Sequence, residues 1–423
     1  MRTLGSSRHG RLMTAVCLGT MMLTFVGGPA LAEETPQKPK VRAITAFIAL
    51  DRMQYQAQIA ETLRMQRAAK NAFEKGGYEV ESLRIVTQPF PEYTRGLTRS
   101  EALEFIRALD GLAGKEGFNL NIGPAMMHDT DDPAQMELLG EILATMPQPL
   151  SSAIIADEAG IHLATIRASA RMLKYVAEHS PRSQGNFNFA VTAMLGPFTP
   201  FYPGAYHTGA GRQFAVGLEG ANVVEQVFRA SKGDPAAASN GLKKALGAHA
   251  LAMEQIARRV ARETGWEYMG IDATPAPLRD VSIGAAIEAF TGVPFGSSGT
   301  MSAAAIITDA VRSIPVQRIG YSGLMVPVLE DTVLARRWNE GRYGIDSLLA
   351  YSAVCGTGLD TVPLPGDVSE EQLARIMGDV AALASKWHKP LSARLLPVHG
   401  KKAGERTEFD DPFLENAVIQ PLP

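Results

Sequence analysis

VRAITAFIAL, residues 41–50, is rich in valine, isoleucine and phenylalanine and predicts a buried first strand. Residues 53–75 follow, with apolar side chains spaced among polar ones, and a glycine pair at 76–77 ends the run. This second pattern predicts a helix that stops at the glycines. The folded part of the chain therefore begins as a strand followed by a helix, which is the repeating unit of α/β proteins.

The same alternation continues toward the C-terminus. Capping boxes at Thr98–Glu101 and Ser369–Gln372 mark two helix starts, and Asp-Pro pairs at 132–133 and 234–235 mark two more. Strands alternating with helices predict a largely parallel sheet with buried strands. The further strands are expected at 78–86, 118–122, 152–156, 187–194, 213–218 and 391–398, and the further helices at 98–112, 134–146, 161–178, 234–262, 281–290, 301–312, 332–338, 346–354 and 369–387.

The first 32 residues have the pattern of a secretory signal peptide. A basic start precedes an apolar stretch at 12–26, and small residues supply a cleavage site after Ala32. The apolar stretch is short for a membrane span, although an uncleaved anchor is the alternative. Residues 33–40 are polar with two prolines and suit a linker. We therefore expect a periplasmic or secreted protein without a stable membrane anchor.

Residues 41–423 are expected to form a single α/β domain, because the strand-like ends 41–50 and 391–398 both look buried. The chain is 46% hydrophobic with a net charge of -3, so no basic excess indicates nucleic acid. Of its two cysteines, Cys17 lies in the expected signal peptide, which excludes an intramolecular disulfide framework in the mature chain. The expected partner is a small-molecule ligand, and a homo-oligomer is left open.

Residues 351–367, YSAVCGTGLDTVPLPGD, form the leading site candidate. Gly356 and Gly358 would let the backbone approach a ligand closely. The thiol of Cys355 could act as a nucleophile, an acid/base or a metal ligand, with Asp360 steering it or a substrate. The alternative is that Cys355 is a small buried residue and Asp360 caps a turn. A helix C-terminus before the thiol would also disfavour the thiolate.

One further candidate lies in the loop at 197–211, which is rich in glycine and proline, and another follows the strand after this loop. His207 lies among aromatic residues and glycines, which suits an acid/base group in a substrate pocket. A hydrogen-bonded loop histidine is the alternative. Glu219 follows the apparently buried strand FAVGL, and a carboxylate at a strand end commonly lines a site in α/β folds. It also commonly caps the next helix.

Charged residues near the C-terminus suggest how a substrate could be held. Arg394 and Lys401 could attract an acidic substrate, and Asp367 closes the candidate loop. The acidic pairs Glu330–Asp331 and Asp410–Asp411 could hold a divalent cation, with exposed loop charge as the alternative. No dinucleotide fingerprint, hydrolase elbow or strongly spaced metal motif is present in the sequence, so neither a cofactor nor a metal is specified.

The C-terminal third resembles an uncharacterised bacterial and archaeal family, the domain of unknown function 711 family. The motifs that carry the resemblance are GYSGLMVPVLED at 320–331, the run at 351–367, KPLSARLLP at 389–397, GKKAG at 400–404, TEFDD at 407–411 and, upstream, FAVGLE at 214–219. The resemblance implies an α/β fold in which barrel-like parallel half-sheets are surrounded by helices, similar to the barrel of glycyl-radical enzymes and ribonucleotide reductases.

In that barrel a functional loop threads the centre, and by this likeness the Cys355 loop would be the central loop. No reaction follows from the resemblance. This chain has no C-terminal glycyl-radical motif, and an exported compartment is oxidising, so radical chemistry is not expected.

Three functions remain open from the sequence. The first is an exported hydrolase or lyase that acts on a small polar or acidic substrate, the second a periplasmic binding protein without catalysis, and the third a structural role. For the first, the candidate catalytic residues are Cys355, Asp360, His207 and Glu219, and the candidate substrate-binding residues are Gly356, Gly358, Asp367, Arg394 and Lys401. Their convergence on one cavity would separate the first two functions from the third.

Overall fold

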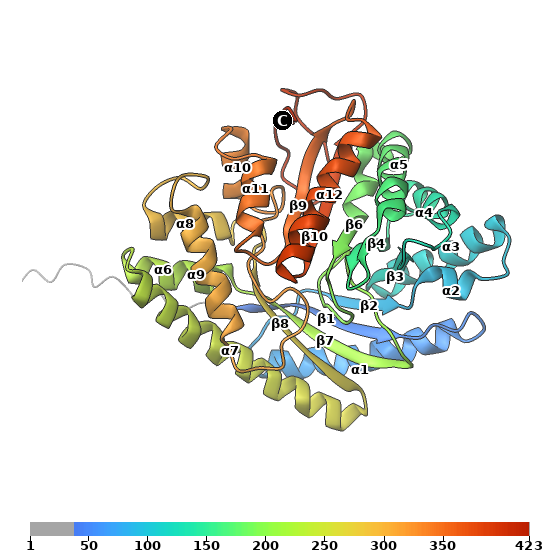
Figure 1. Cartoon of the computed structure of the whole chain (residues 1–423). Helices are drawn as coiled ribbons and strands as arrows, with labels where there is room; N and C mark the ends of the chain where they lie inside the picture. The colour runs from blue at the N-terminus through green and yellow to red at the C-terminus, as the bar shows by residue number, and fades with distance from the viewer. Residues whose placement is uncertain (1–37, 423) are drawn as a thin grey trace, which may run out of the picture. The chain divides into compact units, whose positions relative to one another are not determined.

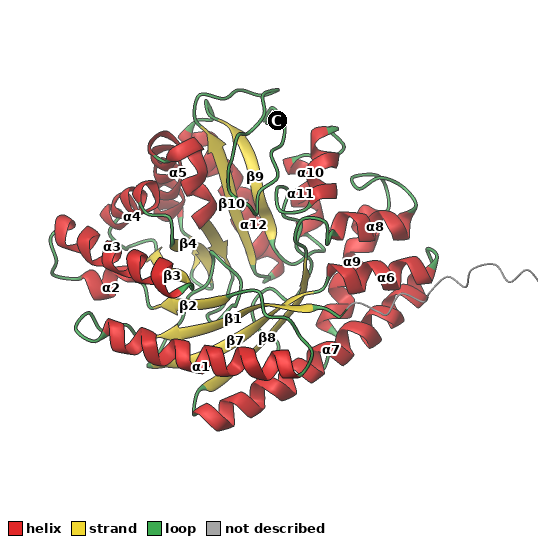
Figure 2. Cartoon of the chain, turned by 180° about the vertical axis from the view of Figure 1, so that it is seen from behind, coloured by secondary structure: helices red, strands yellow, loops and turns green. Residues whose placement is uncertain are grey.

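Five parallel strands form the first half-sheet, in the order β1-β2-β3-β4-β6. Their bounds are β1 Lys40–Ile48, β2 Leu83–Thr87, β3 Asn119–Met126, β4 Pro149–Asp157 and β6 Phe189–Ala193, with β5 Gly160–Ile161 paired to β4. The helices that connect these strands cover the outer face of the half-sheet (Figures 1 and 2). They are α1 Tyr55–Lys75, α2 Phe90–Thr94, α3 Arg99–Glu116, α4 Ala134–Thr145, α5 Leu163–His179 and the 3₁₀ helix η1 Pro181–Asn188.

The second half-sheet holds β7 Gly211–Glu219, β8 Glu267–Ala276, β9 Gly358–Pro365 and β10 Leu391–Val398. β7 joins β1 and β10 joins β6, both antiparallel, whereas β7 pairs with β8 and β9 with β10 in parallel. The two half-sheets therefore run in opposite directions. Their helices are α6 Ala221–Ser231, α7 Pro235–Thr264, α8 Ile283–Thr291, α9 Thr300–Arg312, α10 Thr332–Asn339, α11 Ile345–Ser352 and α12 Glu370–Trp387.

Residues 317–330, here called the bridging segment, connect the two free edges of the sheet. An isolated parallel bridge joins Ile271 of β8 to Arg318, and another joins Pro327 to Asp360 of β9. The segment thus takes the place of a strand between β8 and β9 and closes the sheet into a barrel. The mixed α/β fold with a mostly parallel, barrel-like sheet confirms the expected fold class.

The interior of the barrel is filled by the loop between β6 and β7, residues 194–210, here called the central loop. Three strands hold it: Thr45 Oγ1 donates to Pro200 O at 2.9 Å, Asn121 Nδ2 to Pro203 O at 2.7 Å, and Tyr202 OH to Ile85 O at 2.9 Å. The expectation that the Cys355 loop threads the barrel is therefore wrong. The connection between the two half-sheets does so instead.

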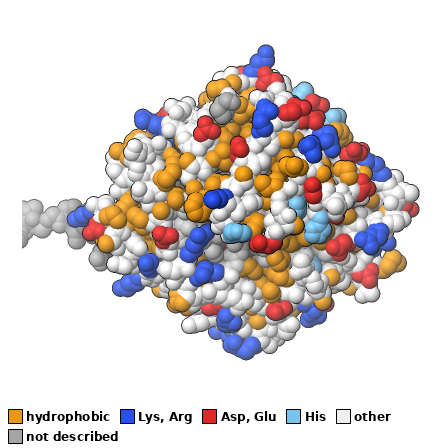
Figure 3. Space-filling view, viewed as in Figure 1, with side chains coloured by type: hydrophobic (Ala, Val, Ile, Leu, Met, Phe, Trp, Pro, Cys, Tyr) orange, Lys and Arg blue, Asp and Glu red, His pale blue; other side chains and the backbone are white. Residues whose placement is uncertain are grey.

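The structure describes residues 38–422, which lie in one compact unit. The expected cleavage after Ala32 and residues 33–37 of the expected linker lie outside the described residues. Within the described range no helix combines the length and apolar character needed to cross a bilayer. The face shown in Figure 3 intersperses acidic, basic and apolar side chains.

Most expected elements are present with boundaries shifted by a few residues. β8, α6 and the short elements α2, β5 and η1 were not expected, and the predicted loop at 356–366 is strand β9 from Gly358 onward. Pro363 and Pro365 made this segment look like a loop. They are tolerated because β9 pairs with β10 on one side, with one register shift, and meets only the bridging segment on the other.

Candidate functional site

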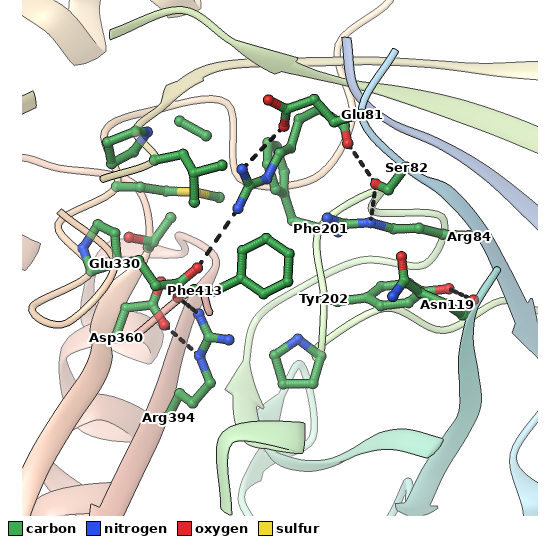
Figure 4. Close-up of a pocket in the computed structure, with 18 of the residues that line it drawn as sticks. Glu81, Ser82, Arg84, Asn119, Phe201, Tyr202, Glu330, Asp360, Arg394 and Phe413 are labelled. Atoms are coloured by element: carbon green, nitrogen blue, oxygen red, sulfur yellow. Dashed lines mark hydrogen bonds and ion pairs between the residues drawn. The ribbon is translucent and has the colours of Figure 1, made fainter. Parts of the chain in front are cut away.

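A cavity of about 430 Å³ opens at one end of the barrel. The first half-sheet contributes residues at or near the N-terminal ends of its strands, and β8 contributes its C-terminal end. Phe201, Tyr202 and Pro203 of the central loop line it from within the barrel, and Phe413 reaches it from the C-terminal segment. The charged and polar lining residues include Arg42, Glu81, Ser82, Arg84, Asn119, Tyr321, Glu330, Thr357, Asp360, Ser392 and Arg394 (Figure 4).

Arg42, the third residue of β1, binds carboxylates from three other segments. Its Nη1 lies 2.8 Å from Glu219 Oε2 at the end of β7 and 3.2 Å from Glu81 Oε2, just before β2. Its Nη2 lies 3.7 Å from Glu330 Oε2 in the bridging segment. The antiparallel junction of the half-sheets places the start of β1 beside the end of β7, so Arg42 and Glu219 meet directly.

Arg394 of β10 holds the opposite part of the same network. Its Nε donates to Asp360 Oδ1 of β9 at 2.7 Å, and its Nη2 binds Glu330 Oε1. The guanidinium also lies over the ring of Phe187, 4.7 Å from the ring centroid. Glu330 therefore joins the two arginines, and the acidic groups on this wall are fixed by ion pairs rather than left to move.

One carboxyl group in the network favours its protonated form. Burial, and then a hydrogen bond with Glu81, raises the pKa of Glu219 to about 8, against the opposing effect of Arg42. Burial therefore favours the protonated form of Glu219 at neutral pH. Glu81 lines the cavity and shares Arg42 with Glu219, so Glu219 is separated from the ligand space by this one layer of side chains.

Arg84 of β2 differs from the other two arginines because no carboxylate in residues 38–422 lies within ion-pair distance of it. Its Nε donates to Ser82 Oγ at 3.0 Å and its Nη1 to Pro200 O at 3.3 Å. Its guanidinium stacks 4.8 Å from the ring centroid of Tyr202. Burial, and then the charge of Arg42, lowers its pKa to about 10, which leaves it cationic at neutral pH.

The structure brings three of the candidate residues to this site. Asp360 and Arg394 line the cavity and bind one another. Glu219 lies one layer behind, joined to the cavity wall through Arg42.

Cys355 does not line the cavity, although it follows α11 as expected. It is buried, and its carbonyl accepts a hydrogen bond from Lys389 Nζ. The adjacent Gly356 leaves no ligand space, because a Cβ there would lie 2.7 Å from the Cα of Gly323. The glycine lets the bridging segment cross the chain closely at this point, which corrects the expectation of space for a ligand.

The other candidates lie elsewhere. His207 Nε2 lies 2.6 Å from the carbonyl of Ile48 at the far end of β1, about 20 Å along the strand from Arg42 by strand rise, and burial lowers its pKa. Gly358 packs against the backbone of Ser392, Asp367 is exposed beyond β9, and Lys401 pairs with Glu408 at 2.9 Å.

Sequence reasoning missed Arg42, Glu81 and Arg84 as site residues. A signal was available for Arg42 and Arg84, since an arginine inside an apolar strand requires a buried partner or a ligand. The acidic pair Glu330–Asp331 is divided by the structure: Glu330 faces the cavity, while Asp331 caps α10 through Val333 N and Leu334 N, both at 3.0 Å. The described part of the chain has no group of three or more His, Cys, Asp or Glu residues arranged to hold a metal ion.

Comparison with known proteins identifies relatives over most of the chain. A family model described as Uncharacterised ACR (DUF711) matches residues 35–410. A UPF0210 protein of Pyrobaculum arsenaticum is 34% identical over 373 residues, covering 84% of this chain and 82% of the relative. One from Desulforudis audaxviator is 32% identical over 350 residues, covering 79% of this chain and 77% of the relative.

Among solved structures, an anaerobic ribonucleotide reductase matches with a TM-score of 0.36 and 8% identity, covering 88% of this chain and 75% of that chain. The anaerobic ribonucleotide reductase from Thermotoga maritima with citrate in the active site matches with a TM-score of 0.35 and 8% identity, covering 84% and 80%.

Proposed function

The chain belongs to the DUF711 family, and from this premise we propose that it is an exported hydrolase or lyase that acts on a small acidic substrate in the cavity at the barrel mouth. The observation that carries the proposal is Arg84, a cationic group in the cavity without a carboxylate partner among residues 38–422. A partly buried guanidinium is costly unless it is paired, and an anionic ligand would supply the missing pair.

The geometry around Arg84 suits a carboxylate. Stacking on Tyr202 and the hydrogen bond to Ser82 fix the plane of the guanidinium. Its Nη2 has no hydrogen-bond partner among the described residues, and Asn119 beside it could donate through its amide. A guanidinium held in one plane binds carboxylate in a defined orientation. The volume of about 430 Å³ is within the range of small-molecule sites.

The catalytic element of the proposal is the carboxyl pair of Glu81 and Glu219. A group whose pKa is near 8 can give or take a proton at neutral pH, as hydrolases and lyases require. None of the residues that line the cavity in the described range is cysteine or histidine, so acid–base catalysis is better supported than covalent catalysis by a thiol. The catalytic roles proposed here therefore fall on Glu81 and Glu219 rather than on Cys355 and His207.

The alternative is a periplasmic protein that binds the same ligand without turnover. It is favoured by the ion pairs that hold both Arg42 and Arg394, because strongly paired groups move little. The two functions share the anion site at Arg84 and differ only in whether the proton of the carboxyl pair reaches the ligand.

The test begins with Arg84→Gln, which removes the charge and keeps part of the side chain. The probes are small carboxylic acids such as lactate, succinate and glutamate, measured by thermal shift and calorimetric titration. We expect at least one to bind the wild-type protein and to bind the variant tenfold or more weakly, since a hydrogen-bonded charge contact contributes about 1.5–3 kcal/mol.

Arg212→Gln is the matched control, because Arg212 also lies over an aromatic ring, Trp266, yet pairs with Glu61 outside the cavity. Equal binding by both variants would refute the anion site. Turnover of the bound acid, followed by NMR, then separates enzyme from binding protein. Cell fractionation with intact mass tests export, for which the mature chain should begin at Glu33.

A further inference from the structure

The cavity carries a second charged atom without a partner, and its sign is opposite to that of Arg84. Asp360 uses Oδ1 to accept from Arg394 Nε at 2.7 Å, while its Oδ2 has no hydrogen-bond or ion-pair partner in the described part of the chain. Asp360 is among the residues that line the cavity. Its spare oxygen is therefore available to a donor on a ligand.

The two incompletely paired groups lie on different walls. Arg84 comes from β2 of the first half-sheet and Asp360 from β9 of the second. Figure 4 shows them on opposite sides of the cavity, with Phe201 and Phe413 between them. The ligand space thus has a cationic end, an apolar middle and an anionic end.

The fixed charges next to the two groups differ in the same sense. Asp360 shares Arg394 with Glu330, so two carboxyl groups meet one guanidinium on that wall. Arg84 has no carboxylate within ion-pair distance among residues 38–422 and is held by Ser82 and the carbonyl of Pro200. A ligand that completes both groups therefore carries one charge of each sign.

We propose that the cavity binds a small amphoteric molecule, with its carboxylate on Arg84, its ammonium group on Asp360 and an apolar portion between Phe201 and Phe413. The inference rests on the proposed anion site at Arg84 and specifies the substrate class for it. Free amino acids with apolar side chains, and dipeptides built from them, have this chemistry and fit a cavity of about 430 Å³.

The test compares matched probes on the full mature protein. L-Phenylalanine and the dipeptide Leu-Phe are the amphoteric probes, 3-phenylpropionate lacks the ammonium group, and phenethylamine lacks the carboxylate. We expect an amphoteric probe to raise the melting temperature and to bind at least tenfold more tightly than either single-charge analogue. This comparison needs no variant, so it does not depend on whether a substitution folds.

Two variants test which protein group binds each end of the ligand. Asp360→Asn should weaken the amphoteric probe about tenfold and leave 3-phenylpropionate unchanged, whereas Arg84→Gln should weaken both acids and leave phenethylamine unchanged. Binding of 3-phenylpropionate as tight as that of L-phenylalanine, or an unaffected Asp360→Asn, would overturn the amphoteric class while leaving the anion site standing. Unchanged acid binding by Arg84→Gln would remove the anion site itself. No binding by any probe would also overturn the inference.

Discussion

Replacing Glu219 with glutamine tests whether the carboxyl pair in the cavity wall holds a proton. Glutamine preserves the volume and a hydrogen bond to Arg42 but cannot ionise. Burial and the hydrogen bond with Glu81 raise the pKa of Glu219 from 4.5 to about 8. A raised carboxyl pKa means that the folded protein binds the proton more tightly than the unfolded chain. The stabilisation is therefore complete below pH 4.5 and is lost as the pH rises through 8.

The magnitude follows from this linkage. Each pH unit between the unfolded and folded pKa values costs the wild-type protein about 1.4 kcal/mol of unfolding free energy, whereas the variant loses nothing through this residue. Burial also raises the pKa of Glu330 in the same network, and those of Asp272 and Asp331 to about 6, but these groups are present in both proteins. The difference between the two proteins therefore reports Glu219, and from pH 6 to pH 8 the wild type should lose roughly 2–3 kcal/mol relative to Glu219→Gln.

The assay is urea unfolding of both proteins at pH 6, 7, 8 and 8.5. Glu61→Gln serves as the control, because Glu61 also pairs with an arginine, Arg212, but its side chain is 44% exposed. As the pH rises, the unfolding free energy of the wild type should fall relative to that of Glu219→Gln. The unfolding free energy of Glu61→Gln should change with pH in parallel with that of the wild type. If instead the wild type gains on Glu219→Gln with rising pH, the pair with Arg42 keeps Glu219 ionised and the proton assignment is refuted.

Two further substitutions test the crossing of the bridging segment over the Cys355 region. Gly356→Ala should lower the unfolding free energy by about 1–3 kcal/mol, because the new Cβ meets the backbone of Gly323. The control Gly114→Ala in α3 has open space around it and should be neutral or stabilising. Equal melting temperatures of the two variants would contradict the crossing. Cys355→Ser should lower stability by about 1 kcal/mol through burial of a hydroxyl and leave binding of carboxylic acids unchanged, so a loss of binding at unchanged stability would restore the thiol to the site.

The sequence was sufficient for the alternation of strands and helices, for the capping boxes of α3 and α12, and for the family. It was insufficient for β8, where Gly270 and the Thr274–Pro275 pair interrupt the apolar pattern. It was also insufficient for β9, because its two prolines are compatible with a strand only where one side lacks a regular ladder. On that side β9 meets the bridging segment through a single isolated bridge. Local patterns do not show which strand lies at an edge, because that depends on pairing between segments far apart in the chain.

The site was partly predictable for the same reason. Asp360 and Arg394 were identified individually, but their ion pair depends on the parallel register of β9 and β10. The apolar patterns around Arg42 and Arg84 predict strands only, and their place at the cavity depends on the meeting of segments from both half-sheets. Cys355 and His207 were predicted to be site residues, yet both lie away from the cavity.

The opposite directions of the two half-sheets bring one charged pair of the mouth together. The start of β1 lies beside the end of β7, so Arg42 meets Glu219. Asp360 and Arg394 instead lie near the starts of β9 and β10, whose parallel pairing brings them together. At the other end of the strands, the interior is filled by an apolar cluster of Phe47, Val86, Ala205 and Ala215, which includes the central loop. The charged groups thus lie at the mouth, and this apolar cluster lies at the other end of the strands. Because Arg42, Arg84, Asp360 and Arg394 sit on strands, and ion pairs tie Glu81 and Glu330 to the two outer arginines, binding need not order these groups.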